Sequence, residues 1–286
     1  MRAKSCLITG ASGFIGRNLC KHLHREGYRL ICLGRSQKPP EEIENIVDKW
    51  IRCDLSDTNR TDEVLHELLS LDIEYFFHLA SRLDTLALAN LEEVYMSDII
   101  SPVKILALLA ERIEYFCFFS SSSVVSCDNL YANNKFILEH AFRAALSGKD
   151  IPYSFLRISS VYGPGMPKTS AMYQFLSNMK KGHRPVIYGD PLSKRDYVFV
   201  DDVVAAAMTV LKNGHAGVYN ISSSERVNLL EMIDIINGIL GTEIGPKIYK
   251  NEKSHDRVVD NTLAKNTFGF SPIRLKSGIQ QLEASL

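Results

Sequence analysis

Three evenly spaced glycines follow the first apolar stretch of the chain. Residues 4–9 form a strand-like run that leads into Gly10, Gly13 and Gly16. Gly10 permits a tight turn, Gly13 lets backbone N–H groups approach a pyrophosphate, and Gly16 lets the next helix pack closely on the strand. Apolar residues recur at four-residue intervals after this turn and predict a helix that ends near residue 26. We therefore predict a dinucleotide-binding turn at a helix N-terminus, with contacts from Gly10, Ser12, Gly13, Phe14, Ile15 and Gly16.

Strand-like and helical patterns alternate along the first half of the chain. We predict strands at 29–33, 50–52, 74–79, 114–120 and 153–158, and helices at 59–70, 88–111 and 131–147. This alternation predicts an α/β fold: a doubly wound parallel sheet of the Rossmann type, which binds ligands at the carboxyl ends of its strands. We assign residues 1–165 to this dinucleotide-binding domain.

The pattern becomes less regular after residue 165. Helices are predicted at 170–181, 203–211 and 228–240, and strands at 185–188 and 218–221. We assign 166–286 mainly to a smaller α/β substrate-binding lobe, while 196–222 also supplies late elements of the main sheet. No low-complexity linker separates the two parts, so we expect packed lobes with a cleft between them.

Charge and cysteine usage narrow the classes of partner. The chain has 286 residues, 45% of them hydrophobic, and 33 basic residues match 33 acidic ones, so nothing favours nucleic acid or an anionic membrane. The absence of a long apolar run, together with a first strand that starts near Met1, predicts a cytoplasmic protein without a signal peptide. The six cysteines form no C-x-x-C pair, which predicts reduced core thiols and no metal site.

A hydroxyl, a phenol and an ammonium are expected to converge at one strand end. The strand predicted at 114–120 runs into four serines at 120–123, and Tyr131 and Lys135 open the next helix. Tyr131 and Lys135 share one helical face, so the ammonium is expected to lower the tyrosine pKa toward a value useful for proton transfer. With 12 tyrosines and 17 lysines in 286 residues, roughly 0.7 accidental Y-x-x-x-K pairs are expected. We interpret the second such pair, Tyr249 and Lys253, as that accident.

Several further motifs occur in a fixed order along nearly the whole chain. They are FHLA at 77–80, FFSSS at 118–122, LR at 156–157, VYGPG at 161–165, YGD at 188–190, KRDYVFVDDV at 194–203, VYNI at 218–221 and FGFSP at 268–272. With the glycine turn and the Ser, Tyr and Lys set, these motifs resemble the extended short-chain dehydrogenase/reductases that act on nucleotide sugars.

The resemblance implies a role for each matching residue. Ser122 would orient the substrate oxygen, Tyr131 would be the acid/base, and Lys135 would bind the nicotinamide ribose and hold Tyr131 in its reactive state. Arg195 would grip the diphosphate of the sugar nucleotide, with assistance from Arg257. The remaining cofactor contacts that the resemblance implies are Asp54 and Leu55, near adenine, and Leu79 and Ala80 in the FHLA motif.

The chain departs from the family pattern in three places. Gly34 and Arg35 stand where the family often has an acidic residue on the adenosine ribose, which favours NADP over NAD; alternatively, Arg35 stacks on adenine or points to water. Only eight residues separate Ser122 from Tyr131, so a loop that normally lines the sugar site is missing. Asp98 replaces a common asparagine, which puts the hydrogen-bond relay behind the site in doubt.

The resemblance implies a 4-ketoreductase that passes a hydride from NADPH to a nucleotide-linked keto sugar, with Tyr131 as the proton donor. One alternative is a 4-epimerase that retains NAD, and another is a non-catalytic dinucleotide-binding scaffold. A 4,6-dehydratase fits less well because Ser123 and Val124 replace the acidic pair of those enzymes. Relatives often dimerise through two long helices, so a homodimer is also expected from the resemblance.

Overall fold

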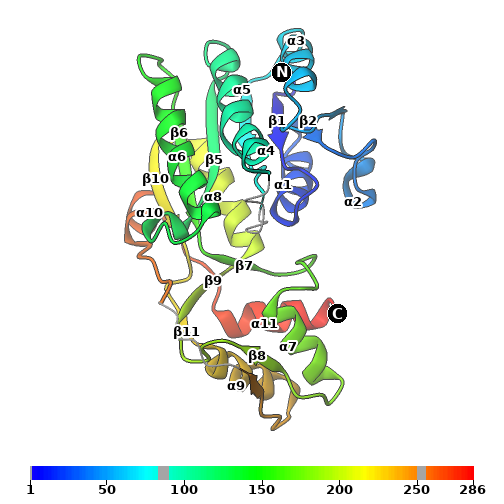
Figure 1. Cartoon of the computed structure of the whole chain (residues 1–286), viewed down its shortest axis with the longest axis vertical. Helices are drawn as coiled ribbons and strands as arrows, with labels where there is room; N and C mark the ends of the chain where they lie inside the picture. Colours follow the sequence, from blue (N-terminus) through cyan, green and yellow to red (C-terminus); the bar gives the residue numbers. More distant parts are fainter. Residues whose placement is uncertain (1, 83–89, 250–255) are drawn as a thin grey trace. The chain divides into compact units, whose positions relative to one another are not determined.

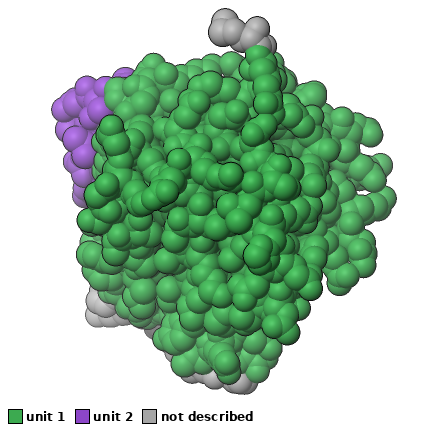
Figure 2. Space-filling view, turned by 90° about the horizontal axis from the view of Figure 1, so that it is seen from above, with its two compact units in different colours: residues 1–157, 207–219 green, residues 158–206, 220–286 purple. Residues whose placement is uncertain are grey.

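The computed structural model of the protein describes residues 2–82, 90–249 and 256–286 (Figure 1). Two compact units, coloured separately in Figure 2, make up the chain. Unit 1 comprises residues 1–157 and 207–219, and unit 2 comprises residues 158–206 and 220–286. The first boundary lies between residues 157 and 158, at the end of strand β6 (Tyr153–Ile158), whereas the sequence placed it at 165–166.

The centre of unit 1 is a seven-stranded sheet with the strand order β10-β6-β5-β4-β1-β2-β3. The strands are β1 (Ser5–Thr9), β2 (Arg29–Gly34), β3 (Lys49–Arg52), β4 (Tyr75–His78), β5 (Tyr115–Ser121), β6 (Tyr153–Ile158) and β10 (Gly217–Ile221). Strands β1 to β5 pair in parallel register, and helices provide the crossovers that parallel neighbours need. The predicted doubly wound parallel sheet is confirmed.

Helices alternate with these strands near the predicted positions. They are α1 (Phe14–Arg25), α2 (Glu41–Glu44), α3 (Thr58–Leu69), α4 (Leu91–Tyr95), α5 (Ser101–Leu109), α6 (Leu130–Leu146) and α8 (Val200–Asn213). A π-helical turn, η2 (Met96–Ile100), joins α4 to α5, and a 3-10 turn, η3 (Ser122–Val125), follows β5. The helix predicted over 88–111 is therefore interrupted, and its first two residues lie outside the described residues. Helix α8 begins before the predicted 203, where Asp201 and Asp202 occupy a favourable first turn.

An aromatic cluster packs between the sheet and α6. Phe116 and Phe118 of β5 lie edge-to-face with Phe142 of α6, with ring centroids 4.9 and 5.0 Å apart. Phe76 and Phe155, on the neighbouring strands, join the same core, and all five side chains are fully buried. Burying each phenyl ring stabilises the fold by about 2–3 kcal/mol. This cluster therefore fixes α6 against the end of β5.

Unit 2 combines two small sheets with helices. A three-stranded sheet has the order β11 (Arg226–Val227), β9 (Arg195–Phe199), β7 (Ser160–Tyr162), and a two-stranded sheet pairs β12 (Lys247–Tyr249) with β8 (Val186–Tyr188). The helices are α7 (Ala171–Lys180), α9 (Leu229–Leu240), α10 (Thr262–Phe268) and α11 (Leu275–Ala284). A capping box between Asn228 and Glu231 begins α9, and Gly241 ends it in the left-handed conformation with φ +66°.

Three further predictions concern cysteines, membranes and metal sites. All six cysteines are free, and five of them are buried. Among the described helices, none is both long and apolar enough to cross a bilayer. Within the same residues, no group of three His, Cys, Asp or Glu side chains is arranged to hold a metal ion.

Candidate active site

The predicted catalytic residues lie where β5 ends and α6 begins. Every residue of β5 is buried, and the 3-10 turn η3 follows directly. Asn129 caps α6, because its side-chain oxygen accepts a hydrogen bond from the backbone N–H of Ala132 at 2.9 Å. Tyr131 therefore occupies the first turn of α6, one helical turn before Lys135.

Lys135 is an almost fully buried cation, with 3% of its surface exposed. Its Nζ donates a hydrogen bond to the backbone carbonyl of Phe119 at 2.9 Å. The ammonium also lies 4.8 Å from the ring centroid of Phe118 and 5.9 Å from that of Tyr131. Burial lowers the pKa of Lys135 to about 8, although Asp98 and a second acid raise it.

The pKa of Tyr131 is raised, so our expectation that Lys135 lowers it is wrong for this structure. Burial is the largest cause, and a hydrogen bond with the side chain of Ser121 only partly offsets it. The Nζ of Lys135 donates its hydrogen bond to the Phe119 carbonyl. Tyr131 is consequently a protonated phenol at neutral pH, which is the form that a proton donor needs.

The serine whose side chain interacts with Tyr131 is Ser121, whereas the sequence analysis had named Ser122. Ser121 Oγ also lies 2.6 Å from Ser123 Oγ and accepts the Ser123 backbone N–H at 3.2 Å. Ser120 points the other way, because side chains alternate along a strand, and donates to Glu139 at 2.6 Å. Ser122 makes no side-chain hydrogen bond with any described residue. Strand alternation could have separated Ser120 from Ser121, but it does not apply to Ser122, because the strand ends at Ser121 and a 3-10 turn follows.

The glycine turn between β1 and α1 has the geometry of a phosphate cradle. Gly10 adopts φ +74°, and a Cβ there would lie 2.6 Å from the Ala80 backbone nitrogen. A Cβ on Gly16 would lie 2.2 Å from the Gly10 carbonyl oxygen. Helix α1 has Gly13 at its N-cap, without a side-chain cap and without an acidic residue in its first turn. Its first backbone N–H groups are therefore available to an anion, and Ser12, Phe14 and Ile15 lie at the same turn.

The FHLA segment lies beside this turn. Thr9 accepts the backbone N–H of Leu79 at 3.1 Å on its carbonyl and that of Ala80 at 3.3 Å on its side chain. The structure thus brings Leu79 and Ala80 together with Gly10 at the carboxyl ends of β1 and β4. A side chain on residue 10 would clash with the backbone of Leu79 and Ala80, so only glycine allows the two strand ends to approach this closely. This close approach is the geometry expected of a dinucleotide-binding turn.

The predicted adenosine contacts lie at the neighbouring strand ends. Arg35 follows directly after β2, and a Cβ on Gly34 would lie 2.2 Å from the Trp50 ring. Burial opposes ionisation of Asp54, but hydrogen bonds from Ser56 and the charges of Arg82 and Arg35 hold the pKa of Asp54 below its ordinary value. Arg35 is therefore close enough to Asp54 for their charges to interact. Leu55, which follows Asp54, is buried.

The two predicted phosphate ligands lie side by side in unit 2. Arg257 donates its backbone N–H to the Lys194 carbonyl at 2.9 Å, and its own carbonyl accepts the Asp196 N–H at 3.2 Å. This pairing forms a parallel bridge between Arg195 and Arg257. The second Y-x-x-x-K pair, Tyr249 and Lys253, cannot be compared with Tyr131 and Lys135, because Lys253 lies outside the described residues.

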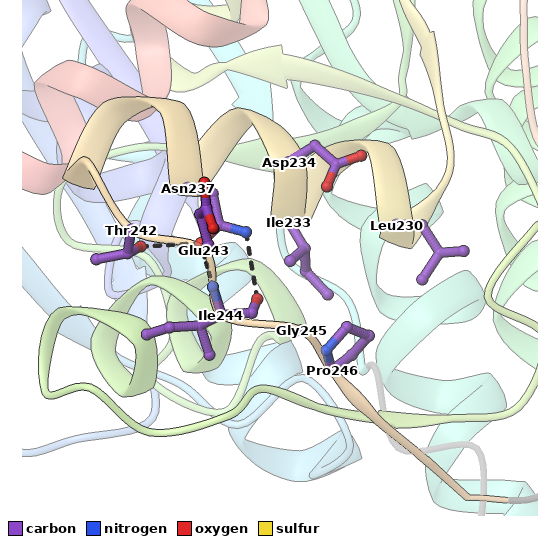
Figure 3. A pocket seen from close by; sticks show the side chains of 9 residues that line it. All are labelled: Leu230, Ile233, Asp234, Asn237, Thr242, Glu243, Ile244, Gly245 and Pro246. Carbon is purple, nitrogen blue, oxygen red and sulfur yellow. Dashed lines mark hydrogen bonds between the residues drawn. The ribbon is translucent and has the colours of Figure 1, made fainter.

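A pocket of about 380 Å³ lies between α9 and residues 242–246 (Figure 3). None of its lining residues was predicted to act in binding or catalysis. Asn237 accepts hydrogen bonds from the Thr242 hydroxyl at 2.8 Å and the Ile244 N–H at 2.9 Å, and it donates to the Ile244 carbonyl at 3.2 Å (Figure 3). The Asn237 amide therefore serves to hold the loop, and we assign no ligand to this pocket.

Comparison with known proteins defines the family. The model of the NAD dependent epimerase/dehydratase family matches residues 6–222. The dTDP-4-dehydro-6-deoxyglucose reductase of Escherichia coli is 28% identical over 315 residues, which cover 100% of this chain and 98% of that protein. The putative UDP-glucose 4-epimerase of Methanocaldococcus jannaschii is 26% identical over 300 residues, which cover 96% of each.

The fold comparison agrees. The UDP-glucose 4-epimerase of Thermotoga maritima with UDP-glucose matches with a TM-score of 0.87 and 22% identity, covering 98% of each chain. At this level of identity the match supports the fold alone. The sequence matches go further, since they extend along most of the chain and include epimerases, dehydratases and reductases of nucleotide sugars. The chain therefore belongs to the NAD dependent epimerase/dehydratase family, which confirms the predicted membership of the extended short-chain dehydrogenase/reductase enzymes.

Proposed function

We propose that the protein is an NADPH-dependent 4-ketoreductase of a nucleotide-linked sugar. The observation that carries this proposal is Arg35, which follows β2 close to Asp54. A cation at the end of the second strand pairs with a 2′-phosphate, whereas the acidic residue often found there repels it. Net reduction consumes a dissociable cofactor such as NADPH. An epimerase instead retains NAD and returns the hydride.

The residues at the end of β5 supply the proton for this reaction. Tyr131 donates its phenolic proton to the carbonyl oxygen of the sugar, and Ser122 holds the developing alkoxide. A preorganised donor at such an oxygen contributes about 2–4 kcal/mol. Lys135 binds the nicotinamide ribose. When bound, the reduced nicotinamide supplies the hydride that completes the reduction of the ketone to an alcohol.

The substrate diphosphate is assigned to Arg195, with Arg257 as its partner. Their adjacent backbones bring two guanidinium groups to one strand edge, and arginine binds phosphate oxygens in a bidentate manner. Arg195 is half-buried and Arg257 is exposed, so binding an anion there costs little desolvation.

The test is incubation of the purified protein with a panel of nucleotide 4-keto sugars and with either NADPH or NADH. We expect oxidation of NADPH, followed at 340 nm, and one reduced sugar identified by mass spectrometry and NMR. Purified protein should carry little nicotinamide cofactor. Tightly bound NAD together with interconversion of C4 epimers would favour the epimerase, and neither turnover nor cofactor binding would favour the scaffold.

Two features of the setting complete the proposal. Helices α4 to α6 expose large apolar side chains, among them Tyr95, Phe136 and Ile137, which supports a homodimer formed through these helices. The six free cysteines support a reducing compartment such as the cytoplasm. Size-exclusion chromatography with light scattering tests the dimer directly.

A further inference from the structure

Four buried or half-buried charges lie on α6 or on elements that flank it, and two of them are already paired. Glu139 is 1% exposed and accepts two hydrogen bonds from Arg157, from Nε at 2.9 Å and from Nη2 at 2.7 Å. Asp98 and Lys135, each 3% exposed, are left. Neither forms an ion pair within 4 Å with any residue that the structure describes. A buried charge without a counter-charge is costly, so these two require an explanation.

The π-helical turn places Asp98 in the interior. The backbone N–H of Ser101 bonds to the Met96 carbonyl, five residues earlier, instead of the usual four. Pro102 explains this change, because it has no N–H and its ring crowds the carbonyl four residues before it, which is that of Asp98. A π-turn of this kind is frequent at functional sites. The π-helical turn packs directly against α6, so Asp98 and Lys135 are buried residues of two adjoining elements.

No described cation neutralises the Asp98 carboxylate directly. It accepts the Arg82 backbone N–H at 3.1 and 3.3 Å and the Ser97 hydroxyl at 3.1 Å. The guanidinium of Arg82 is engaged elsewhere, 3.5 Å from Glu93 and 3.9 Å from Asp54. Burial raises the pKa of Asp98, and Lys135 is the one cation whose charge lowers it.

The other titratable groups that face Lys135 are either paired with another residue or neutral, so its counter-charge is Asp98. The charge of Glu139 is largely offset by Arg157. His78 lies on β4, and burial lowers the pKa of its imidazole well below the ordinary value, so it is neutral. Tyr131 is neutral for the reason given above. The only other described charge acting on Lys135 is therefore that of Asp98.

We propose that Asp98 is a positioning residue, the buried counter-charge that keeps the Lys135 ammonium protonated beside Tyr131. The two charges act on one another through the low-dielectric interior without direct contact. What the protonated ammonium does in catalysis rests on the proposed function. The electrostatic coupling between Asp98 and Lys135 does not, and it is measured without any substrate.

The experiment is a pH titration of the full chain labelled with ¹³Cε-lysine and followed by NMR, with Lys135→Arg identifying the resonance of Lys135. In the wild type we expect this resonance to titrate near pH 8. Asp98→Asn removes a negative charge without changing shape, so the ammonium loses its proton more readily and the midpoint falls by about one pH unit. Glu93→Gln, which removes an exposed charge nearby, and Ser97→Ala, which removes a neutral partner of Asp98, should leave it in place.

A reciprocal measurement covers the case in which Asp98→Asn does not fold. Coupling between two titrating sites is mutual, so Lys135→Met must raise the midpoint of Asp98, followed by ¹³Cγ-aspartate labelling. An unchanged Lys135 midpoint in folded Asp98→Asn, or an unchanged Asp98 midpoint in Lys135→Met, would overturn the proposal. An equal shift in Ser97→Ala would also overturn it, because the effect would then be one of packing. The predicted shifts in a protein that reduces none of the keto sugars would reject the proposed function and leave the counter-charge intact.

Discussion

The site where β5 ends carries buried charges, whereas the strand edge of unit 2 that holds Arg195 and Arg257, here called the arginine edge, carries partly exposed ones. In unit 1, Lys135 and Asp98 are buried, and their ionisation depends on desolvation and on each other. In unit 2 the buried charge is Asp196, whose carboxylate accepts the backbone N–H groups of Ser223 at 2.8 Å and Ser224 at 3.0 Å. The cation beside it in sequence, Arg195, keeps part of its surface exposed.

This difference indicates a division of labour. Burial shifts a pKa strongly, so a buried charge pair is suited to setting the energy of a proton transfer. An arginine that keeps part of its surface exposed stays charged and binds a phosphate without a large desolvation cost. The comparison predicts that changes where β5 ends and α6 begins act on turnover and that changes at the arginine edge act on substrate affinity.

Replacing the proposed proton donor should have the largest effect. Tyr131→Phe removes one oxygen and retains the ring, so turnover of the keto sugar should fall by roughly 10²–10⁴-fold, the usual contribution of general acid catalysis. The fold and NADPH affinity should not change. Tyr249→Phe, on exposed β12, is the matched control and should behave like the wild type. Full turnover by Tyr131→Phe would show that another group is the acid.

Arg195→Ala tests the other side of the comparison. Losing a charge-assisted contact to the diphosphate costs about 1.5–3 kcal/mol, so KM should rise by roughly 10- to 100-fold while kcat changes little. Steady-state kinetics would measure both. Arg226→Ala, on the neighbouring β11, should have little effect. If kcat fell with KM unchanged, or if dinucleotide affinity were lost, the division of labour would be wrong.

Arg35→Asp tests the cofactor within unit 1. It should weaken NADPH binding at least about tenfold more than NADH binding, because the new carboxylate repels the 2′-phosphate. Fluorescence titration with each reduced cofactor would measure the two affinities. Arg29→Asp, at the opposite end of β2, is the control. Equal effects on both cofactors would mean that Arg35 does not meet the 2′-phosphate.

Asp196→Asn should have the smallest effect, on stability. One of its two acceptor oxygens becomes an amide N–H₂ that faces a backbone N–H, so the free energy of unfolding should fall by about 1–3 kcal/mol. Denaturant unfolding would measure this change. Asp234→Asn, on the exposed face of α9, should change stability by less than about 0.5 kcal/mol. Similar values for the two variants would contradict the anchoring role of Asp196.

Most of the fold was predictable because it follows from short-range rules. The strand predicted at 153–158 agrees with β6, and the helices predicted at 131–147 and 228–240 agree with α6 and α9 to within one residue. Strand β8 agrees with the strand predicted at 185–188, but β7, β9, β11 and β12 were not predicted, because they are short and are stabilised by pairing with distant segments, as Arg195 is with Arg257. The π-turn was also missed, although Pro102 was a usable signal.

The sequence by itself determined the glycine turn, the alternation of strands and helices, and the placement of Tyr131 and Lys135 on one helical face, since each depends on backbone conformation and local periodicity. Only the tertiary structure decided that Ser121 meets Tyr131, that the pKa of Tyr131 is raised, and that Asp98 is buried near Lys135. These properties depend on desolvation and on charges from elements far apart in the chain, and sequence spacing contains no information about either.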